Sequence, residues 1–204
     1  MAMKSLMEAL SDGILSYSHA IGDQIWDQIS KIEYLSRRIL SLELADHKQL
    51  HREALELRLV VQDFFSQYES LFLKQSQKYE IDIPAEEIVA MDPMDLERIL
   101  HNIATNFAKY AGHHSTLRIF FKKQSRHWLL SFSDDGTGID TEHLHKIGTL
   151  FYRADISRHT HQDTMSSWLG IALIEKVVSR YKWYARFSSG GVDKWFCVTL
   201  YFPR

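Results

Sequence analysis

The stretch DDGTGI at residues 134–139 decides the fold of this chain, and it follows an apolar run, 128–132, that is typical of a buried strand. A carboxylate at a strand end can accept a hydrogen bond from an exocyclic amine. The two glycines that follow let the backbone approach a bound ligand closely. The spacing Asp-x-Gly-x-Gly therefore predicts a strand that ends in a nucleotide-binding turn, although the motif is weak when taken alone.

A helical segment upstream strengthens this interpretation. Residues 96–110 have a helical pattern and carry Asn102 and Asn106 one turn apart. Side chains at positions i and i+4 share one face of a helix, so both amides can meet the same ligand. Two asparagines can also be surface or capping residues. The helix followed by the 134–139 turn favours the ligand-binding alternative.

With two further motifs, LFYR at 150–153 and LGIA at 169–172, the chain resembles the ATP-binding domain of sensor histidine kinases, in the GHKL ATPase superfamily. The resemblance implies an α+β fold. In this fold, an α/β sandwich has a mixed, mostly antiparallel sheet with helices on one face, and a helical hairpin precedes it. It also implies that ATP and magnesium are bound, that a histidine is phosphorylated, and that a response regulator protein then receives the phosphoryl group.

The family's site residues can be carried over one by one. Asn102 resembles the magnesium-ligating asparagine, whose amide oxygen is a hard donor suited to Mg²⁺, and with Lys109 it is the expected catalytic position. Asp134 resembles the aspartate that reads adenine. The other residues that resemble nucleotide contacts are Asn106, Lys109 and Tyr110 on the helix, Gly136, Gly138 and Ile139 after the strand, Phe151, Arg153 and Arg158 in the expected lid over ATP, and Leu169 and Gly170 in the second glycine-rich box.

That second box departs from the family pattern. Family members have Gly-x-Gly-Leu-Gly-Leu, whereas this chain has SSWLGI at 166–171. Glycines before a helix leave backbone N–H groups free to bind phosphate, and Trp168 adds bulk there and restricts φ. Trp168 either caps the nucleotide by stacking or packs on the domain surface. Ser166 and Trp168 thus favour an alternative, a degenerate non-catalytic regulatory module. An anti-sigma-type serine kinase is a second alternative, and the helical preface argues against it.

We expect two domains, a helical preface at 1–46 and an ATP-binding domain at 50–204. Apolar residues between Ile25 and Leu42 recur in steps of three and four, which is typical of a bundle helix. The preface resembles the family's dimerization and phosphoacceptor hairpin without its His-Glu-x-x-Thr-Pro-Leu box. His19 is expected at the far end of a helix of about 23 residues, ~34 Å from the exit toward the ATP-binding domain at ~1.5 Å per residue. That distance argues against His19 as the phosphate acceptor. We therefore expect a homodimer that does not phosphorylate itself.

The remaining elements follow from periodicity and turn signals. The expected strands are 79–83, 88–91, 116–122, 128–133, 184–188 and 194–202. The expected helices are 55–77, 93–111, 141–148 and 169–181.

Composition excludes several other classes of protein. With 24 basic and 26 acidic residues among 204, the chain offers no electrostatic basis for binding nucleic acid. Apolar runs such as 169–174 are far shorter than the ~20 residues of a membrane helix, and no signal-peptide pattern opens the sequence. The single cysteine, Cys197, indicates a buried thiol. We expect a cytoplasmic protein, the cytoplasmic part of an inner-membrane sensor, and leave open whether the parent chain is membrane-anchored.

Overall fold

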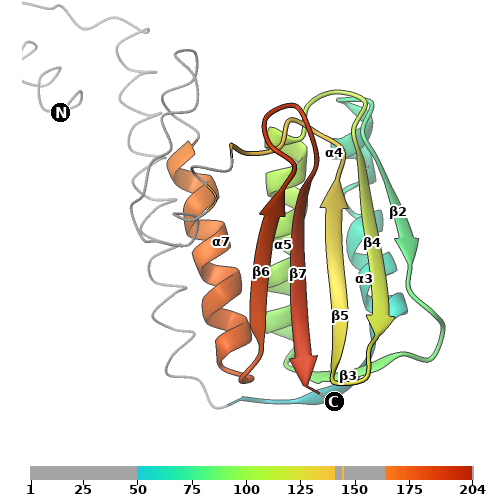
Figure 1. Cartoon of the computed structure of the whole chain (residues 1–204). Coiled ribbons are helices and arrows are strands. Elements are labelled where there is room, and N and C mark those ends of the chain that lie inside the picture. Colours follow the sequence, from blue (N-terminus) through green and yellow to red (C-terminus); the bar gives the residue numbers. More distant parts are fainter. Residues whose placement is uncertain (1–49, 141–143, 145–163, 204) are drawn as a thin grey trace, which may run out of the picture. The chain divides into compact units, whose positions relative to one another are not determined.

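The structure is a computed structural model that describes residues 50–140, 144 and 164–203 of the chain (Figure 1). The chain divides into two compact units, Met1–Leu44 and Ala45–Arg204, and all described residues belong to the second. The expected preface with His19 lies outside the described residues. So do the expected lid residues Phe151, Arg153 and Arg158 and, except for Leu144, the expected helix at 141–148.

A five-stranded sheet with the strand order β2-β4-β5-β7-β6 forms the centre of the second unit. Strand β2 pairs with β4 in parallel, and all other neighbours are antiparallel. The strands are β2 (Lys78–Asp82), β4 (Thr116–Lys123), β5 (His127–Asp134), β6 (Tyr184–Ser189) and β7 (Phe196–Pro203). The predicted mixed, mostly antiparallel sheet is confirmed.

Helices cover one face of this sheet, as Figure 1 shows. They are α3 (Leu57–Ser66), α4 (Glu69–Leu73), α5 (Pro93–Tyr110) and α7 (Thr164–Ser179). The predicted α+β class, with helices packed against one face of the sheet, is therefore confirmed. Helix α5 begins sharply because the Asp92 carboxylate accepts the backbone N–H of Met94 at 2.9 Å and Pro93 occupies the first helical position.

The core lies between α5, α7 and the sheet. Apolar side chains on one face of α5 and α7 are buried against alternate residues of the strands. The fully or almost fully buried members include Leu96, Ile99, Leu100, Ile103 and Phe107 of α5, Ile174, Val177 and Val178 of α7, and Ile119, Leu130, Phe132, Val198 and Leu200 of the sheet. This packing fixes the rotation of α5 and hence the direction of its two asparagines.

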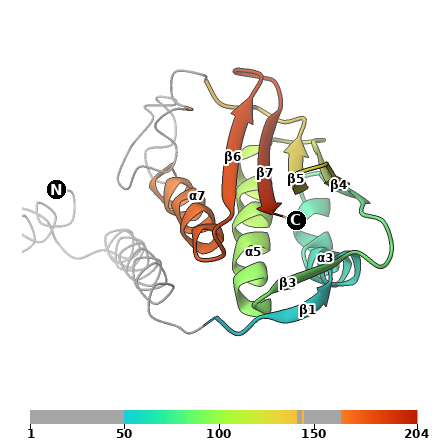
Figure 2. The ribbon, with the colours of Figure 1, turned by 60° about the horizontal axis from the view of Figure 1, so that its bottom comes forward.

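The prediction of one helix at 55–77 is wrong. Its first residues belong to a strand, β1 (Glu53–Glu56), which pairs antiparallel with β3 (Ile88–Met91) in a separate two-stranded sheet. Figure 2 shows this small sheet next to the N-terminal end of α5. The partner strand is distant in sequence, so the local helical pattern does not reveal the pairing.

The same segment is interrupted a second time between α3 and α4. The Ser66 hydroxyl donates to the carbonyl of Asp63 at 2.8 Å, a local bond of the kind that competes with helix continuation. Phe65 and Phe72, on either side of the break, both pack on Tyr79 of β2, with ring centroids 5.5 and 6.1 Å apart. Contact with the sheet therefore sets where the helix ends.

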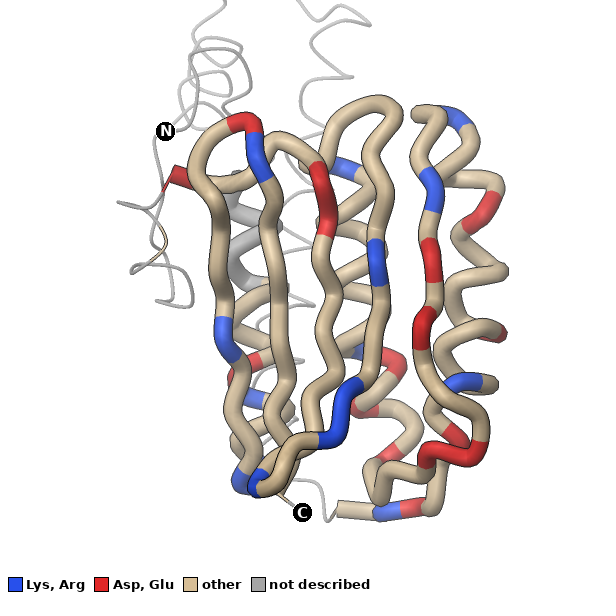
Figure 3. Tube along the Cα trace, turned by 45° about the vertical axis from the view of Figure 1, so that its right-hand side comes forward, with Lys and Arg blue, Asp and Glu red and all other residues tan. Residues whose placement is uncertain are grey.

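Charged residues of both signs are interspersed over the described strands and helices (Figure 3). Cys197 on β7 is half-buried, which is less than the sequence suggested. Burial raises the pKa of its thiol.

Candidate functional site

The turn after β5 lies against the C-terminal end of α5. A Cβ atom on Gly136 would overlap the backbone of Ala111, including its carbonyl oxygen, so only glycine fits there without a shift of the chain. The Thr137 hydroxyl donates to the carbonyl of Tyr110 at 2.6 Å. The two motifs recognised in the sequence, the strand end and the asparagine helix, are thereby brought together at one end of the domain.

The second half of the turn is held by the β6–β7 hairpin. Gly138 has φ +59, in the left-handed region that favours glycine, and its Cβ would overlap the carbonyl oxygen of Gly191. The next residue, Ile139, donates its backbone N–H to the Ser189 hydroxyl at 2.9 Å. Both glycines are thus required by close backbone approach within the fold itself.

Asp134 is the last residue of β5 and is partly withdrawn from water. Burial raises its pKa to about 6, and the neighbouring charge of Asp135 acts in the same direction. The backbone N–H of Gly136, which donates to the carboxylate at 3.0 Å, opposes this rise. Hydrogen bonds to a partly buried carboxylate are strong because the surroundings screen charge less than water does.

An apolar cluster lies next to this carboxylate. Asp134 pairs with Phe196 in the sheet, and Phe196 packs with Phe187 and Ile139 against Ile171 of α7. A charged acceptor beside aromatic and aliphatic side chains suits a flat, mostly apolar ring that carries an amine. The site residue Ile139 thus belongs to this apolar cluster.

The polar residues expected to contact phosphate and magnesium lie along α5. Asn102 is 2% exposed and donates its Nδ2 to the carbonyl of Arg98 at 2.6 Å, which directs the amide oxygen away from the helix backbone. Asn106 is half-buried one turn later, Lys109 is exposed in the last turn, and Tyr110 is half-buried at the end of the helix. The spacing of the two asparagines puts them on one helix face.

The donor set suits magnesium better than a metal that needs several anionic ligands. In the described part of the chain, no group of three or more His, Cys, Asp or Glu residues could hold a metal ion. Mg²⁺ takes few protein ligands and completes its octahedron with water and phosphate oxygens. An amide oxygen, such as that of Asn102, is a donor of the kind that Mg²⁺ accepts.

The second glycine-rich box does not precede its helix, because α7 begins at Thr164 and not at the predicted residue 169. Ser166, Trp168 and Leu169 therefore have helical backbone, and Gly170 is buried in the helix. The cause is the residue composition of 164–169. Without the family's glycines, nothing at 164–169 opposes helical φ and ψ angles.

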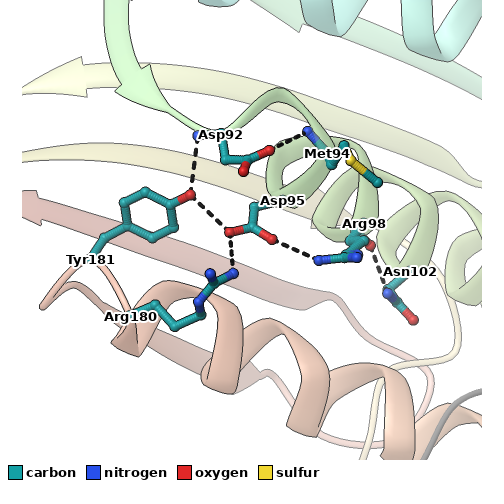
Figure 4. A network of polar contacts seen from close by, with 7 residues as sticks. All are labelled: Asp92, Met94, Asp95, Arg98, Asn102, Arg180 and Tyr181. Atoms are coloured by element: carbon teal, nitrogen blue, oxygen red, sulfur yellow. Dashed lines mark hydrogen bonds and ion pairs between the residues drawn. The ribbon is translucent and has the colours of Figure 1, made fainter. Parts of the chain in front are cut away.

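A buried polar network at the opposite end of α5 was not predicted from the sequence (Figure 4). Asp95 accepts hydrogen bonds from Arg98 at 2.9 Å, from Arg180 at 2.7 Å and from the Tyr181 hydroxyl at 2.8 Å. Burial raises the pKa of Tyr181, which therefore stays a neutral donor. The signal was available in part, since Asp95, Arg98 and Asn102 have the i, i+3, i+7 spacing of one helix face.

Comparison with known families matches residues 91–204, more than half of the chain, to the family described as Histidine kinase-, DNA gyrase B-, and HSP90-like ATPase. Among proteins of similar sequence, the sensor protein VanSB of Enterococcus faecalis is 28% identical over 126 residues, which cover 62% of this chain and 28% of VanSB. The sensor histidine kinase CusS of Escherichia coli K12 is 26% identical over 180 residues, covering 85% of this chain and 36% of CusS. The chain spans about a third of the length of these relatives.

Solved structures show the same fold. The histidine kinase AdeS of Acinetobacter baumannii has a TM-score of 0.69 at 19% identity, covering 99% of this chain and 93% of that chain. Histidine kinase ThkA in complex with response regulator protein TrrA has a TM-score of 0.70 at 14% identity, covering 98% and 57%. None of the described helices is both long and apolar enough to cross a membrane. The family match, supported by this fold, places the chain in the histidine kinase-, DNA gyrase B- and HSP90-like ATPase family, among relatives that include the sensor histidine kinase CusS.

Proposed function

We propose that this chain is the catalytic core of a two-component sensor histidine kinase that binds magnesium-ATP. The observation that carries the proposal is the meeting of three features at one end of the domain. These are the partly buried carboxylate of Asp134, the close-packed turn with Gly136 and Gly138, and the end of the helix that bears Asn102.

In this proposal Asp134 reads adenine. Its carboxylate accepts the exocyclic amine, while the apolar cluster around Ile171, with Ile139, provides contact for the ring. Tyr110, at the end of α5, forms a further wall. A site built around a hydrogen-bonding carboxylate rejects purines that lack the amine, because a buried acceptor would then have no partner. The proposed site is therefore selective for adenine.

The phosphates and the metal are assigned to α5. Asn102 supplies the magnesium ligand, and Asn106 and Lys109 contact the phosphates, together with Arg153 and Arg158 outside the described residues. Phe151 opens the lid, and Leu169 and Gly170 flank the nucleotide from α7. Phosphoryl transfer needs mostly positioning and charge neutralisation, and an amide, an ammonium and guanidinium groups provide both.

The acceptor is a histidine on a dimerization hairpin, and the phosphoryl group then passes to an aspartate of a response regulator. Support comes from the relatives, which are sensor kinases, and from ThkA, whose structure holds a response regulator. The 204 residues contain no His-Glu-x-x-Thr-Pro-Leu box. We propose that the kinase acts as a homodimer through this hairpin, on the cytoplasmic side of the membrane, and that the 204 residues, without the box, do not phosphorylate themselves.

Calorimetric titration with magnesium-ATP tests the proposal. The wild-type chain should bind, and Asp134→Asn should weaken binding by about one to two orders of magnitude, since a hydrogen bond to a charged group contributes ~1.5 to 3 kcal/mol. Asp193→Asn is a matched control. It removes a carboxylate from the exposed hairpin turn, at φ 55, a conformation that asparagine tolerates. Its affinity should equal that of the wild type.

The competing function is a non-catalytic regulatory module that keeps the fold and has lost the nucleotide. Helical backbone at Ser166 and Trp168, where the family has glycines, favours this alternative. Absence of binding by the wild-type chain at millimolar magnesium-ATP would refute the catalytic proposal and favour the regulatory module. If Asp134→Asn and Asp193→Asn lowered the affinity for ATP equally, only the proposed role of Asp134 would be refuted.

A further inference from the structure

Ser189, the last residue of β6, has a hydroxyl group whose hydrogen-bonding capacity is fully used. The hydroxyl accepts the backbone N–H of Ile139 at 2.9 Å and that of Gly191 at 3.2 Å. It donates to the carbonyl of Trp195 at 3.0 Å, and the carbonyl of Gly191 lies farther away at 3.4 Å. A hydroxyl has one proton and two lone pairs. This one side chain therefore closes the β6–β7 hairpin and also holds the turn after β5.

The turn is attached to the hairpin at three successive residues. The carbonyl of Thr137 accepts the backbone N–H of Asp193 at 2.7 Å. Gly138 lies so close that a Cβ atom on it would overlap a carbonyl oxygen of the hairpin. Ile139 is bound to Ser189. The first of these three contacts joins two backbone groups and the second is steric, so the third is the one that depends on a side-chain functional group.

Ser189 and Asp134 lie in one row across the sheet. Phe196 of β7 is directly opposite Ser189 on one side and directly opposite Asp134 on the other. Opposite side chains point to the same face of a sheet. Neighbouring strands are ~4.8 Å apart, so Asp134 and Ser189 are separated by about 10 Å. The chain leaves β5 at Asp134, runs along the β6–β7 hairpin (Figure 1), and is fixed at the far end of this row through Ile139.

We propose that Ser189 is a positioning residue for adenine: its hydroxyl fixes Ile139 and thereby sets the separation between the apolar wall of the pocket and the Asp134 carboxylate. This inference rests on the proposed function, in which Asp134 accepts the exocyclic amine and Ile139 contacts the ring. Ser189 needs no contact with the nucleotide for this role. Without the hydroxyl, the Ile139 N–H loses its acceptor and the wall is free to move away from the base.

The experiment combines ligand binding with amide exchange on the 204-residue chain. Ser189→Ala removes the hydroxyl and adds no bulk. Its affinity for magnesium-ATP, measured by calorimetry, should fall about 2- to 10-fold, the effect of one neutral hydrogen bond. Hydrogen exchange followed by NMR should be faster at the Ile139 amide than in the wild type, because this N–H has lost its acceptor. Affinity for magnesium tripolyphosphate, which has no base, should not change.

Two further variants serve as rescue and control. Ser189→Thr keeps the hydroxyl on a residue that strands favour, so it should restore both the affinity for ATP and the protection of the Ile139 amide. Ser188→Ala is the matched control. Ser188 is the preceding residue of β6, so its side chain points to the opposite face of the sheet, away from the turn. This control should leave affinity and amide exchange at the wild-type level.

The outcomes separate this inference from the proposed function. If the wild type binds ATP and Ser189→Ala binds it equally well, the positioning role is refuted and the catalytic proposal stands. An unchanged exchange rate at Ile139 also refutes the role. So does an equal loss of affinity for ATP and for tripolyphosphate, because a general loosening of the fold affects both ligands alike. If Ser189→Ala does not fold, Ser189→Cys, whose thiol is a weaker donor and acceptor, is judged by the same criteria. No binding by the wild type refutes both proposals.

Discussion

Asp134 and Asp95 are both carboxylates withdrawn from water, and they differ in how their charge is compensated. Within the described residues, Asp134 receives backbone N–H groups and no cation, and its pKa rises to about 6. Asp95 is buried more deeply and receives two guanidinium groups and a hydroxyl. The protein's own side chains satisfy Asp95, whereas Asp134 keeps an unfavourable charge that a ligand can stabilise. The carboxylate of Asp95 stabilises the fold, and the carboxylate of Asp134 is suited to binding a ligand.

The largest expected difference between the two is in stability. Asp95→Ala removes the carboxylate that accepts hydrogen bonds from two guanidinium groups and a hydroxyl, and breaking such a cluster typically costs ~3 to 5 kcal/mol of unfolding free energy. Asp134→Ala removes a charge that is unfavourable in the folded state and should cost little. Chemical denaturation of both variants at pH 7 measures this. A loss at Asp134 as large as that at Asp95 would contradict the contrast.

The second prediction concerns pH. Asp134 has a folded pKa of about 6 against 3.8 in the reference state. Between these values the folded chain binds more protons than the unfolded chain, so this group lowers stability as pH rises from about 4 to 6, by at most ~3 kcal/mol. Asp134→Asn should therefore be more stable than the wild type at pH 7 and no more stable at pH 4. Denaturation midpoints of the wild type and of Asp134→Asn, measured across this range, test the assignment. A difference between them that did not change with pH would contradict it.

The smallest expected effect comes from the edge of the Asp95 cluster. The guanidinium carbon of Arg52 lies 5.1 Å from the centroid of the Tyr181 ring, and Tyr181 donates to Asp95. A cation–π contact at an exposed site contributes ~0.5 to 1 kcal/mol. Arg52→Ala should lower the unfolding free energy by about that amount and leave nucleotide affinity unchanged. A loss equal to that of Asp95→Ala would mean that Arg52 belongs to the cluster itself.

The same two carboxylates illustrate which features of the fold and of the site could be predicted from the sequence. The Asp134 turn is a local motif, so its glycines and their neighbours could be recognised within six residues, and strands such as β3 and β5 were located to within one residue of their ends. The helix predicted at 55–77 failed because β1 needs β3, more than thirty residues later. The Asp95 cluster was missed because Arg180 and Tyr181 are 85 and 86 residues away from it.

Local spacing was enough to predict the family, the strand end with its two glycines and the asparagine helix, because each pattern lies within a few residues. The contact of the Gly136 backbone with Ala111, and the link that Asp95 makes between α5 and the turn after α7, are visible only in the folded chain. The reason is physical. Steric exclusion and charge compensation act between atoms in space, and the partners that satisfy them can lie anywhere in the chain.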